Sequence, residues 1–354
     1  LGLDIFGSSF FMLTRYEEVV KSDRDEHDRF PAVASLAYQE GFLERPIVNE
    51  YLEILWACMK RLWPEVNRRR REYEVLLSCD VDSPLAVCGK SWSDVLLSCG
   101  ADMLRRRDLY LSGRRFYAFC CQGRRNLDVD PYNTFDFAMN VSEQYGLASA
   151  FYFMAVEDDR RTEFDGLYSI EHAWIRKLMR RISRRGHEVG FHGSYGASFD
   201  RTRIEYEVEA LLAMMQEEGI DQPHIGGRMH YLRWSGPCTW RLWEDAGLDY
   251  DSSLAFAEHT GFRSGSCYSY PVFDVTTRQP LLLVEKPLIT MEVSMLSPLY
   301  MNLNAEGEVY NKVSSLRERI RPFRGQFVLL WHNNNLAAKR QRNMFKEVVA
   351  IAKP

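Results

Sequence analysis

The sequence lacks the features that mark several large classes of protein. It has no apolar run near the ~20 residues needed to cross a bilayer, and no basic segment followed by an apolar one at its start. It also lacks C-x-x-C pairs, G-x-G-x-x-G and Walker loops, and the G-x-S-x-G elbow. We therefore predict no membrane span, no cysteine-bound zinc, and no dinucleotide, nucleoside triphosphate or serine hydrolase site.

A strong net charge is also absent. Lys and Arg number 45 and Asp and Glu 49, which gives a net charge of −4, so no basic field predicts a nucleic-acid partner. Eight cysteines lie mostly in apolar stretches, which fits reduced core thiols and favours a cytoplasmic protein. With 46% hydrophobic and 27% charged residues in a chain of 354, the composition is that of a globular protein with a sizeable core.

The pattern of the sequence changes near residue 72. Residues 1–72 combine aromatic and charged residues with an apolar helical pattern over 52–62, and they end after the arginine run 68–71. Beyond this point strand-like runs alternate with helical patterns, which is typical of βα units around a parallel sheet, open or closed into a barrel. We therefore predict a mainly helical N-terminal extension over 1–72 and an α/β domain over 73–354. The expected strands include 75–79, 150–156, 188–191, 281–284, 287–292 and 327–331, and the expected helices include 134–145, 200–218 and 313–320.

Two carboxylates follow the first predicted strand. Asp80 and Asp82 are two positions apart, so extended backbone projects both side chains to the same side. Two like charges this close raise the pKa of one carboxyl group unless a cation lies beside them. A bound metal would supply that cation. The alternative is structural, with residues 82–84 capping a turn and Asp80 in a salt bridge.

Histidines and an arginine follow three further predicted strands, where the loops of parallel α/β folds converge. His192 ends an apolar run before glycine-flanked polar residues, a place where an imidazole can ligate a metal. Arg228 can hold a carboxylate through two hydrogen bonds, and His230 is the nearest unassigned imidazole. His332 follows an apolar run and enters an Asn-rich loop, which suits a general acid. Each has a structural alternative. His192 could be a histidine of the core, the segment around Arg228 a solvated basic loop, and His332 a buried histidine hydrogen-bonded to a carboxylate.

Five short segments together resemble the polysaccharide deacetylases with NodB homology, carbohydrate esterases that act on N-acyl sugars. They are 80–82 (Asp-Val-Asp), 186–192 (Gly-His-Glu-Val-Gly-Phe-His), 226–228 (Gly-Gly-Arg), 250–254 (Tyr-Asp-Ser-Ser-Leu) and 330–332 (Leu-Trp-His). The combination is specific, although each segment alone occurs by chance. The resemblance implies a distorted (β/α) barrel of the NodB type.

The resemblance also implies roles for individual residues. Asp80 is expected to be the catalytic base, Arg228 to orient it, and His332 to be the general acid. Asp82 and His192 are expected to hold a divalent metal, with zinc as the expected ion. A neighbouring aspartate, at position 249 or 251, is expected to orient the general acid.

One position departs from the pattern of the family. Its second metal histidine stands four residues after the first, but Gly196 occupies that position here. Because catalytic zinc usually has three protein ligands, we predict that His230 replaces the missing histidine. The surrounding segment 228–233 (Arg-Met-His-Tyr-Leu-Arg) resembles a subgroup from surface-polysaccharide loci that also carries an N-terminal extension.

The expected function is removal of an N-acetyl or N-formyl group from a sugar in polysaccharide or O-antigen biosynthesis, by a metal-dependent hydrolase. The expected partner is an N-acylated sugar, an oligosaccharide or a sugar-linked intermediate. The alternative is a relative that has lost metal binding and activity and only binds glycans. Candidates for contact with the sugar are aromatic and polar side chains near the strand ends: Ser194, Tyr195, Tyr231, Arg233 and Trp331.

Overall fold

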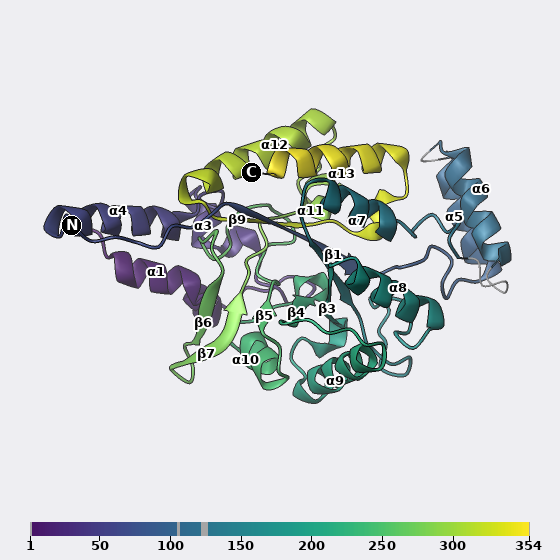
Figure 1. The fold of residues 1–354 in the computed structure, drawn as a ribbon, viewed down its shortest axis with the longest axis horizontal. Coiled ribbons are helices and arrows are strands. Elements are labelled where there is room, and N and C mark those ends of the chain that lie inside the picture. Colours follow the sequence, from purple (N-terminus) through teal and green to yellow (C-terminus); the bar gives the residue numbers. More distant parts are fainter. Residues whose placement is uncertain (1, 105–106, 122–126, 354) are drawn as a thin grey trace.

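The computed structural model describes residues 2–104, 107–121 and 127–353. Within these residues, one sheet of nine strands forms the centre of the molecule (Figure 1). The strands are β1 (Glu74–Val81), β2 (Ser149–Phe153), β3 (Glu188–Gly193), β4 (Gly226–Met229), β5 (Tyr250–Asp251), β6 (Tyr270–Asp274), β7 (Gln279–Glu285), β8 (Thr290–Met291) and β9 (Gln326–Leu330). Their order is β6-β7-β5-β4-β3-β2-β1-β9-β8, and every neighbouring pair is parallel except β6 with β7.

This strand order is that of a (β/α) barrel that has not closed. Strands β1 to β5 are neighbours in chain order, β7 follows β5, and β9 and β8 lie on the other side of β1. The edges of the sheet are β6 and β8, so the barrel is open between these two strands. Figure 1 shows the sheet curled, with helices around its outer face. The distorted (β/α) barrel expected from the sequence is confirmed.

Helices cover the outer face because alternate strand residues are apolar and pack against them. On β1, Val75, Leu77, Cys79 and Val81 belong to the main buried core, whereas Asp80 belongs to the opposite face of the strand. No helix within the described ranges is both long enough and apolar enough to cross a bilayer. The helices that follow the strands are α7 (Phe135–Gln144), α8 (Ala173–Arg184), α9 (Arg201–Glu217), α10 (Cys238–Asp245), α11 (Glu292–Leu296), α12 (Glu306–Ile320) and α13 (Lys339–Ala352).

The observed elements agree with most of the predicted segments. The predicted strands 75–79, 188–191 and 327–331 correspond to β1, β3 and β9, and the predicted helix 200–218 corresponds to α9. The cap of α9 is Asp200, whose side chain accepts a hydrogen bond from the backbone N–H of Arg203 at 3.1 Å. The prediction of a strand over 287–292 was wrong at its end, because only Thr290–Met291 pairs as β8 and α11 begins at Glu292.

A pair of helices that the sequence analysis did not predict lies between β1 and α7. These are α5 (Trp92–Leu104) and α6 (Leu109–Cys121), which project from the barrel as a pair (Figure 1). They pack on each other, with the rings of Trp92 and Phe119 4.5 Å apart. Several of their large apolar side chains are exposed, so they lack the clear apolar stripe from which a helix facing a core is predicted.

The described part of the extension is helical and packs against the barrel. Its helices are α1 (Ile5–Leu13), α2 (Tyr16–Val20), α3 (Leu36–Gln39) and α4 (Ile47–Leu62). Met12, Phe30 and Val48 form a small core of their own, which Phe256 of the barrel joins. The buried carboxylate of Glu18 accepts two hydrogen bonds from the buried Arg263 of the barrel, at 2.9 and 2.5 Å. The division into domains at residue 72 stays a prediction.

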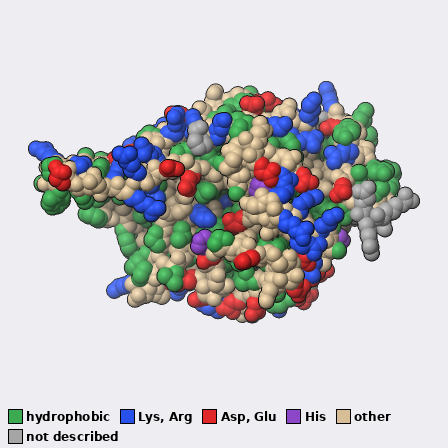
Figure 2. Space-filling model, in the orientation of Figure 1, with side chains coloured by type: hydrophobic (Ala, Val, Ile, Leu, Met, Phe, Trp, Pro, Cys, Tyr) green, Lys and Arg blue, Asp and Glu red, His purple; other side chains and the backbone are tan. Residues whose placement is uncertain are grey.

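The surface carries charges of both signs. Figure 2 shows Lys and Arg side chains and Asp and Glu side chains spread over the same face, with acidic groups gathered along its lower edge. Part of this charge is paired, as between Arg176 and Arg180 of α8 and Glu217 and Glu218 at the end of α9. The mixture accords with the net charge of −4.

Candidate metal centre and active site

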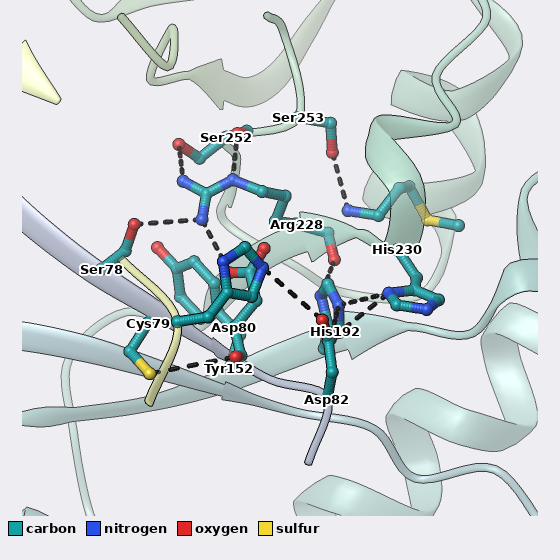
Figure 3. Close-up of polar contacts among 12 residues, drawn as sticks. Ser78, Cys79, Asp80, Asp82, Tyr152, His192, Arg228, His230, Ser252 and Ser253 are labelled. Carbon is teal, nitrogen blue, oxygen red and sulfur yellow. Dashed lines mark hydrogen bonds and ion pairs between the residues drawn. The ribbon is translucent and has the colours of Figure 1, made fainter. Parts of the chain in front are cut away.

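Polar side chains meet at the carboxyl ends of the barrel strands. Asp80 lies on β1 and Asp82 directly beyond it, His192 lies on β3, Arg228 on β4, and His332 follows β9. Because these strands are neighbours in one curled sheet, their ends converge. Figure 3 shows the side chains from β1, β3 and β4 pointing toward one another. The structure therefore brings together the catalytic and metal-binding residues predicted from separate strand ends.

Asp82, His192 and His230, which begins the turn after β4, form a compact group of possible metal ligands. Asp82 Oδ1 lies 3.0 Å from His192 Nε2 and 3.3 Å from His230 Nδ1. The two ring nitrogens are 3.0 Å apart, and one ligand atom from each residue lies within 4.8 Å of the others. A carboxylate oxygen and two imidazole nitrogens are a donor set that zinc accepts.

The other contacts of the two histidines fix which nitrogen faces this group. His192 Nδ1 lies 2.9 Å from the carbonyl oxygen of Arg228, and His230 Nε2 lies 2.9 Å from that of Phe164. Because a carbonyl oxygen only accepts, these nitrogens carry protons, and in the neutral form of each ring the other nitrogen directs a lone pair toward the group. Asp82 Oδ1 is buried, and no described residue donates a hydrogen bond to it. The lone pairs and the carboxylate repel one another until a cation or an added proton joins them, so these residues fit a divalent metal.

The turn that carries His230 has an unusual backbone. Tyr231 and Leu232, the two residues after it, have φ values of 59° and 54°. Residues other than glycine rarely adopt this left-handed conformation, and they keep it where the surrounding structure enforces it. The turn directs His230 back toward Asp82 from the end of β4.

Asp80 is held by a buried arginine. The Nη1 atom of Arg228 donates hydrogen bonds to Asp80 Oδ1 at 2.7 Å and to Ser78 Oγ at 3.0 Å, and Nε donates to the carbonyl oxygen of Ser252 at 2.7 Å. Burial favours the neutral form of Arg228, but the charge of Asp80 outweighs it and raises the pKa of Arg228. A Cβ atom at Gly227 would lie 1.7 Å from the carbonyl oxygen of Phe191, the residue opposite on β3. Only glycine therefore lets the two strands approach closely enough to place Arg228 here.

His332 is oriented by Glu292, a contact that the sequence analysis did not predict. His332 Nδ1 lies 2.6 Å from Glu292 Oε1, and the same oxygen accepts from the His332 backbone N–H at 2.9 Å. His332 Nε2 lies 3.5 Å from Asp82 Oδ2. Burial disfavours the charged ring, but the charges of Glu292, Asp82 and Asp80 outweigh it and raise the pKa of His332 to about 10.

The expectation that an aspartate at position 249 or 251 orients His332 is corrected. Asp249 accepts a hydrogen bond from the backbone N–H of Ile225 at 2.7 Å. Asp251 accepts one from the backbone N–H of Ser253 at 2.9 Å. Both carboxylates stabilise local backbone, and Glu292 makes the contact to the histidine.

A cavity of about 650 Å³ opens onto this group. Asp80, Asp82, His230 and His332 line it, together with residues 25, 26, 27 and 29 of the extension. Its volume suits a sugar residue with its substituents. The apolar side chains that line it are Leu232, Ala257, Met291, Val293 and Leu299.

One of the residues predicted to touch a sugar lines this cavity, and a second contacts residues that line it. Tyr231 lines it, and Tyr195 stands beside the extension, with its hydroxyl group 3.1 Å from His27 Nδ1. The two tyrosine rings are in contact, with centroids 5.4 Å apart. Their contact with a sugar stays a prediction.

The other three predicted sugar contacts are occupied elsewhere, and their role is corrected to a structural one. Ser194 is buried and donates a hydrogen bond to Glu207. Trp331 is 2% exposed and belongs to the apolar core. Arg233 is paired with Asp28 of the extension at 2.9 Å. None of the three is among the described residues that line the cavity.

Comparison with known proteins gives limited likeness. The model of a family of unknown function (DUF7033) matches residues 1–64, and no curated protein matches the chain. A solved structure assigned as a polysaccharide deacetylase from Mycobacterium smegmatis is 15% identical, with 80% of this chain and 85% of that one covered and a TM-score of 0.47. Puue allantoinase is 13% identical, with 82% and 86% covered and a TM-score of 0.45. A protein from Pseudomonas aeruginosa PAO1, also assigned as a polysaccharide deacetylase, is 11% identical, with 79% and 84% covered and a TM-score of 0.43. At these identities the activity of this chain has to be inferred from its own residues.

Proposed function

We propose that the chain is a metal-dependent amidohydrolase that removes an N-acetyl or N-formyl group from a sugar in the assembly of a polysaccharide or O-antigen. The observation that carries this proposal is the group formed by Asp82, His192 and His230, of which Asp82 and His230 line a cavity together with Asp80 and His332. Hydrolysis of an amide needs an activated water, a polarised carbonyl group and a proton for the departing amine. The site holds a group suited to each need.

Asp82, His192 and His230 would hold the metal, for which we propose zinc. A bound divalent ion lowers the pKa of water and polarises a carbonyl oxygen. The two histidines bind in their neutral form, because the carbonyl oxygens behind them retain the ring protons. Asp82 contributes the negative charge of the site.

Asp80 would accept the proton of the attacking water. The carboxylate of Asp80 is fixed through Oδ1 by Arg228, which keeps Asp80 oriented toward the cavity that it lines. Arg228 is itself fixed by Ser78 and Ser252. Arg228 is therefore a positioning residue, and Asp80 is the base.

His332 would donate a proton from Nε2 to the leaving amine. Its Nδ1 proton is bound by Glu292, so the second ring proton is the one available on the cavity side. The carboxylate of Glu292 stabilises the charged ring and so keeps this acid protonated at neutral pH.

Glu292→Gln should lower kcat by roughly tenfold or more, since general acids and bases contribute ~10²–10⁴-fold. Glutamine keeps an acceptor near Nδ1 but removes the negative charge. The pKa of His332 therefore falls, and the alkaline limb of the pH–kcat profile moves to lower pH. Glu347→Gln, at an exposed position of α13, is the control and should leave the profile unchanged. An alkaline limb that stays in place in Glu292→Gln would contradict this role.

The proposed function is tested by release of amine. The chain is loaded with Zn²⁺ and incubated with N-acetyl- and N-formylhexosamines, free and in oligosaccharides, and the liberated amine is measured by fluorescence labelling. We expect release that stops on chelation and returns with Zn²⁺. The glycan-binding alternative predicts sugar binding in a calorimeter, with no amine released and no stoichiometric metal after gentle purification.

A further inference from the structure

Residues 25–29 of the extension form part of the wall of the catalytic cavity. The side chains of Asp25, Glu26, His27 and Arg29 line the same space as the metal-binding and acid–base residues. They lie some 200 positions from the barrel residues that they contact. A segment that reaches the reacting group from outside the barrel can determine which substrates fit beside that group.

This wall is fixed to the barrel by two buried arginines. Arg29 Nη1 donates a hydrogen bond to the carbonyl oxygen of Tyr231 at 3.0 Å. In the other direction, Arg233 Nε donates to the carbonyl oxygen of His27 at 2.8 Å, and Arg233 Nη2 lies 2.9 Å from Asp28 Oδ2. Hydrogen bonds with charged donors are strong, so the wall keeps a defined position relative to the site.

His27 presents an aromatic ring within this wall. Its centroid lies 4.7 Å from that of Tyr231, 5.6 Å from that of Phe164 and 5.9 Å from that of Tyr195. Burial and the charge of Arg29 lower the pKa of His27. An uncharged ring within an aromatic cluster suits the apolar face of a sugar.

The charges of this wall disfavour an anionic substituent next to it. Arg29 is the only lysine or arginine among the described lining residues, and its guanidinium is paired with Asp25 at 2.7 Å. Arg233, one of the predicted sugar contacts, is paired with Asp28. By contrast, the side chain of Glu26 lines the cavity and is 85% exposed. A sugar carboxylate or phosphate would find no free cation on this wall and would face a carboxylate.

We infer that residues 25–29 are the specificity-determining wall of the cavity, and that they select a neutral N-acyl sugar over one that carries a carboxylate or phosphate. His27 contacts the sugar ring, and Glu26 repels anionic substituents. The inference rests on the proposed function for the identity of the cavity as the sugar site. It assigns a task to a part of the chain that matches a family of unknown function.

The test compares two oligosaccharides that both contain N-acetylglucosamine. Chitotetraose is neutral, and the hyaluronan tetrasaccharide carries glucuronate. Dissociation constants are measured by calorimetry on the Zn²⁺-loaded full chain with Asp80→Asn, which prevents turnover, and KM is measured by amine release with Asp80 intact. We expect chitotetraose to bind at least tenfold more tightly, and His27→Ala to weaken it at least fivefold with zinc content unchanged. Glu26→Lys should narrow the preference at least threefold.

Asp23→Lys is the matched control. Asp23 is exposed, belongs to the same segment of the extension and is not among the lining residues, so the same change of charge there should leave the preference unchanged. Glu26 is exposed as well, so its variant tests the inference even if His27→Ala fails to fold. The inference is overturned if neither oligosaccharide binds, if hyaluronan binds more tightly, or if Glu26→Lys and Asp23→Lys act alike. Binding with these effects but without amine release would refute the proposed hydrolysis and leave the inference about the wall standing. Amine release with an unchanged KM in His27→Ala would refute the inference about the wall and leave the proposed hydrolysis standing.

Discussion

Asp80→Asn should lower kcat for amine release by roughly 10²–10⁴-fold, the contribution typical of a general base. Asparagine has nearly the same shape and can still accept the hydrogen bond from Arg228, but it cannot take up a proton. Asp80 is not among the three residues proposed to hold the metal, so zinc content should stay at one ion per chain. The measurement is kcat by amine release, with zinc determined by elemental analysis on the same sample.

This substitution also leaves the buried charge of Arg228 without its counter-charge, which destabilises the chain. Circular dichroism at the assay temperature separates this loss of stability from loss of the base. Ser78→Ala is the matched control, because it removes another acceptor of a hydrogen bond from Arg228 Nη1 but leaves the carboxylate that would take up the proton. We expect this control to retain activity within a few-fold. More than a tenth of the original kcat in Asp80→Asn would exclude Asp80 as the base.

His192→Ala should abolish both stoichiometric zinc binding and amine release. The substitution leaves two protein ligands, whereas catalytic zinc sites usually have three. Loss of a residue that only supports a ligand typically costs 10–100-fold in metal affinity, so we expect loss of a ligand itself to exceed that range. Zinc per chain after dialysis against a weak chelator is the measurement.

His187→Ala is the control for this substitution, since His187 precedes the same strand at its other end. Its Nδ1 accepts a hydrogen bond from the backbone N–H of Ser149 at 2.9 Å, and its Nε2 lies 3.2 Å from Glu143. We expect full zinc content in this variant, with some loss of stability. Retention of zinc by His192→Ala would mean that other residues bind the ion. His230→Ala under the same dialysis decides whether His230 is the third ligand.

The barrel could be predicted because its strands are local in sequence. A strand buried on both faces reads as a short apolar run, and the polar residue that follows marks its carboxyl end. Asp80, Asp82, His192 and His332 were found in this way, and the structure brings them together at one end of the sheet. The resemblance of the motifs to a known family then assigned a role to each of these residues.

The contacts that were missed join distant parts of the chain. Glu292 follows a strand of only two residues. Two residues give too little alternation to show in the sequence where that strand ends, although Glu292 is the last residue of the predicted strand 287–292. Arg233 reads as a free cation in sequence, because its partner Asp28 is 205 positions away. No periodicity reports a pairing of this kind. The wall formed by residues 25–29 could not be predicted for the same reason.

The left-handed pair Tyr231 and Leu232 has a consequence for the energetics of the whole chain. These residues aim His230, and the carbonyl oxygen of Tyr231 accepts its hydrogen bond from Arg29 of the extension. An ion bound at His230 would hold this turn in the form that accepts the hydrogen bond, so ion binding and packing of the extension would favour each other by the same free energy. A loaded centre should slow proteolytic clipping of the extension, and a loosened extension should let the ion escape.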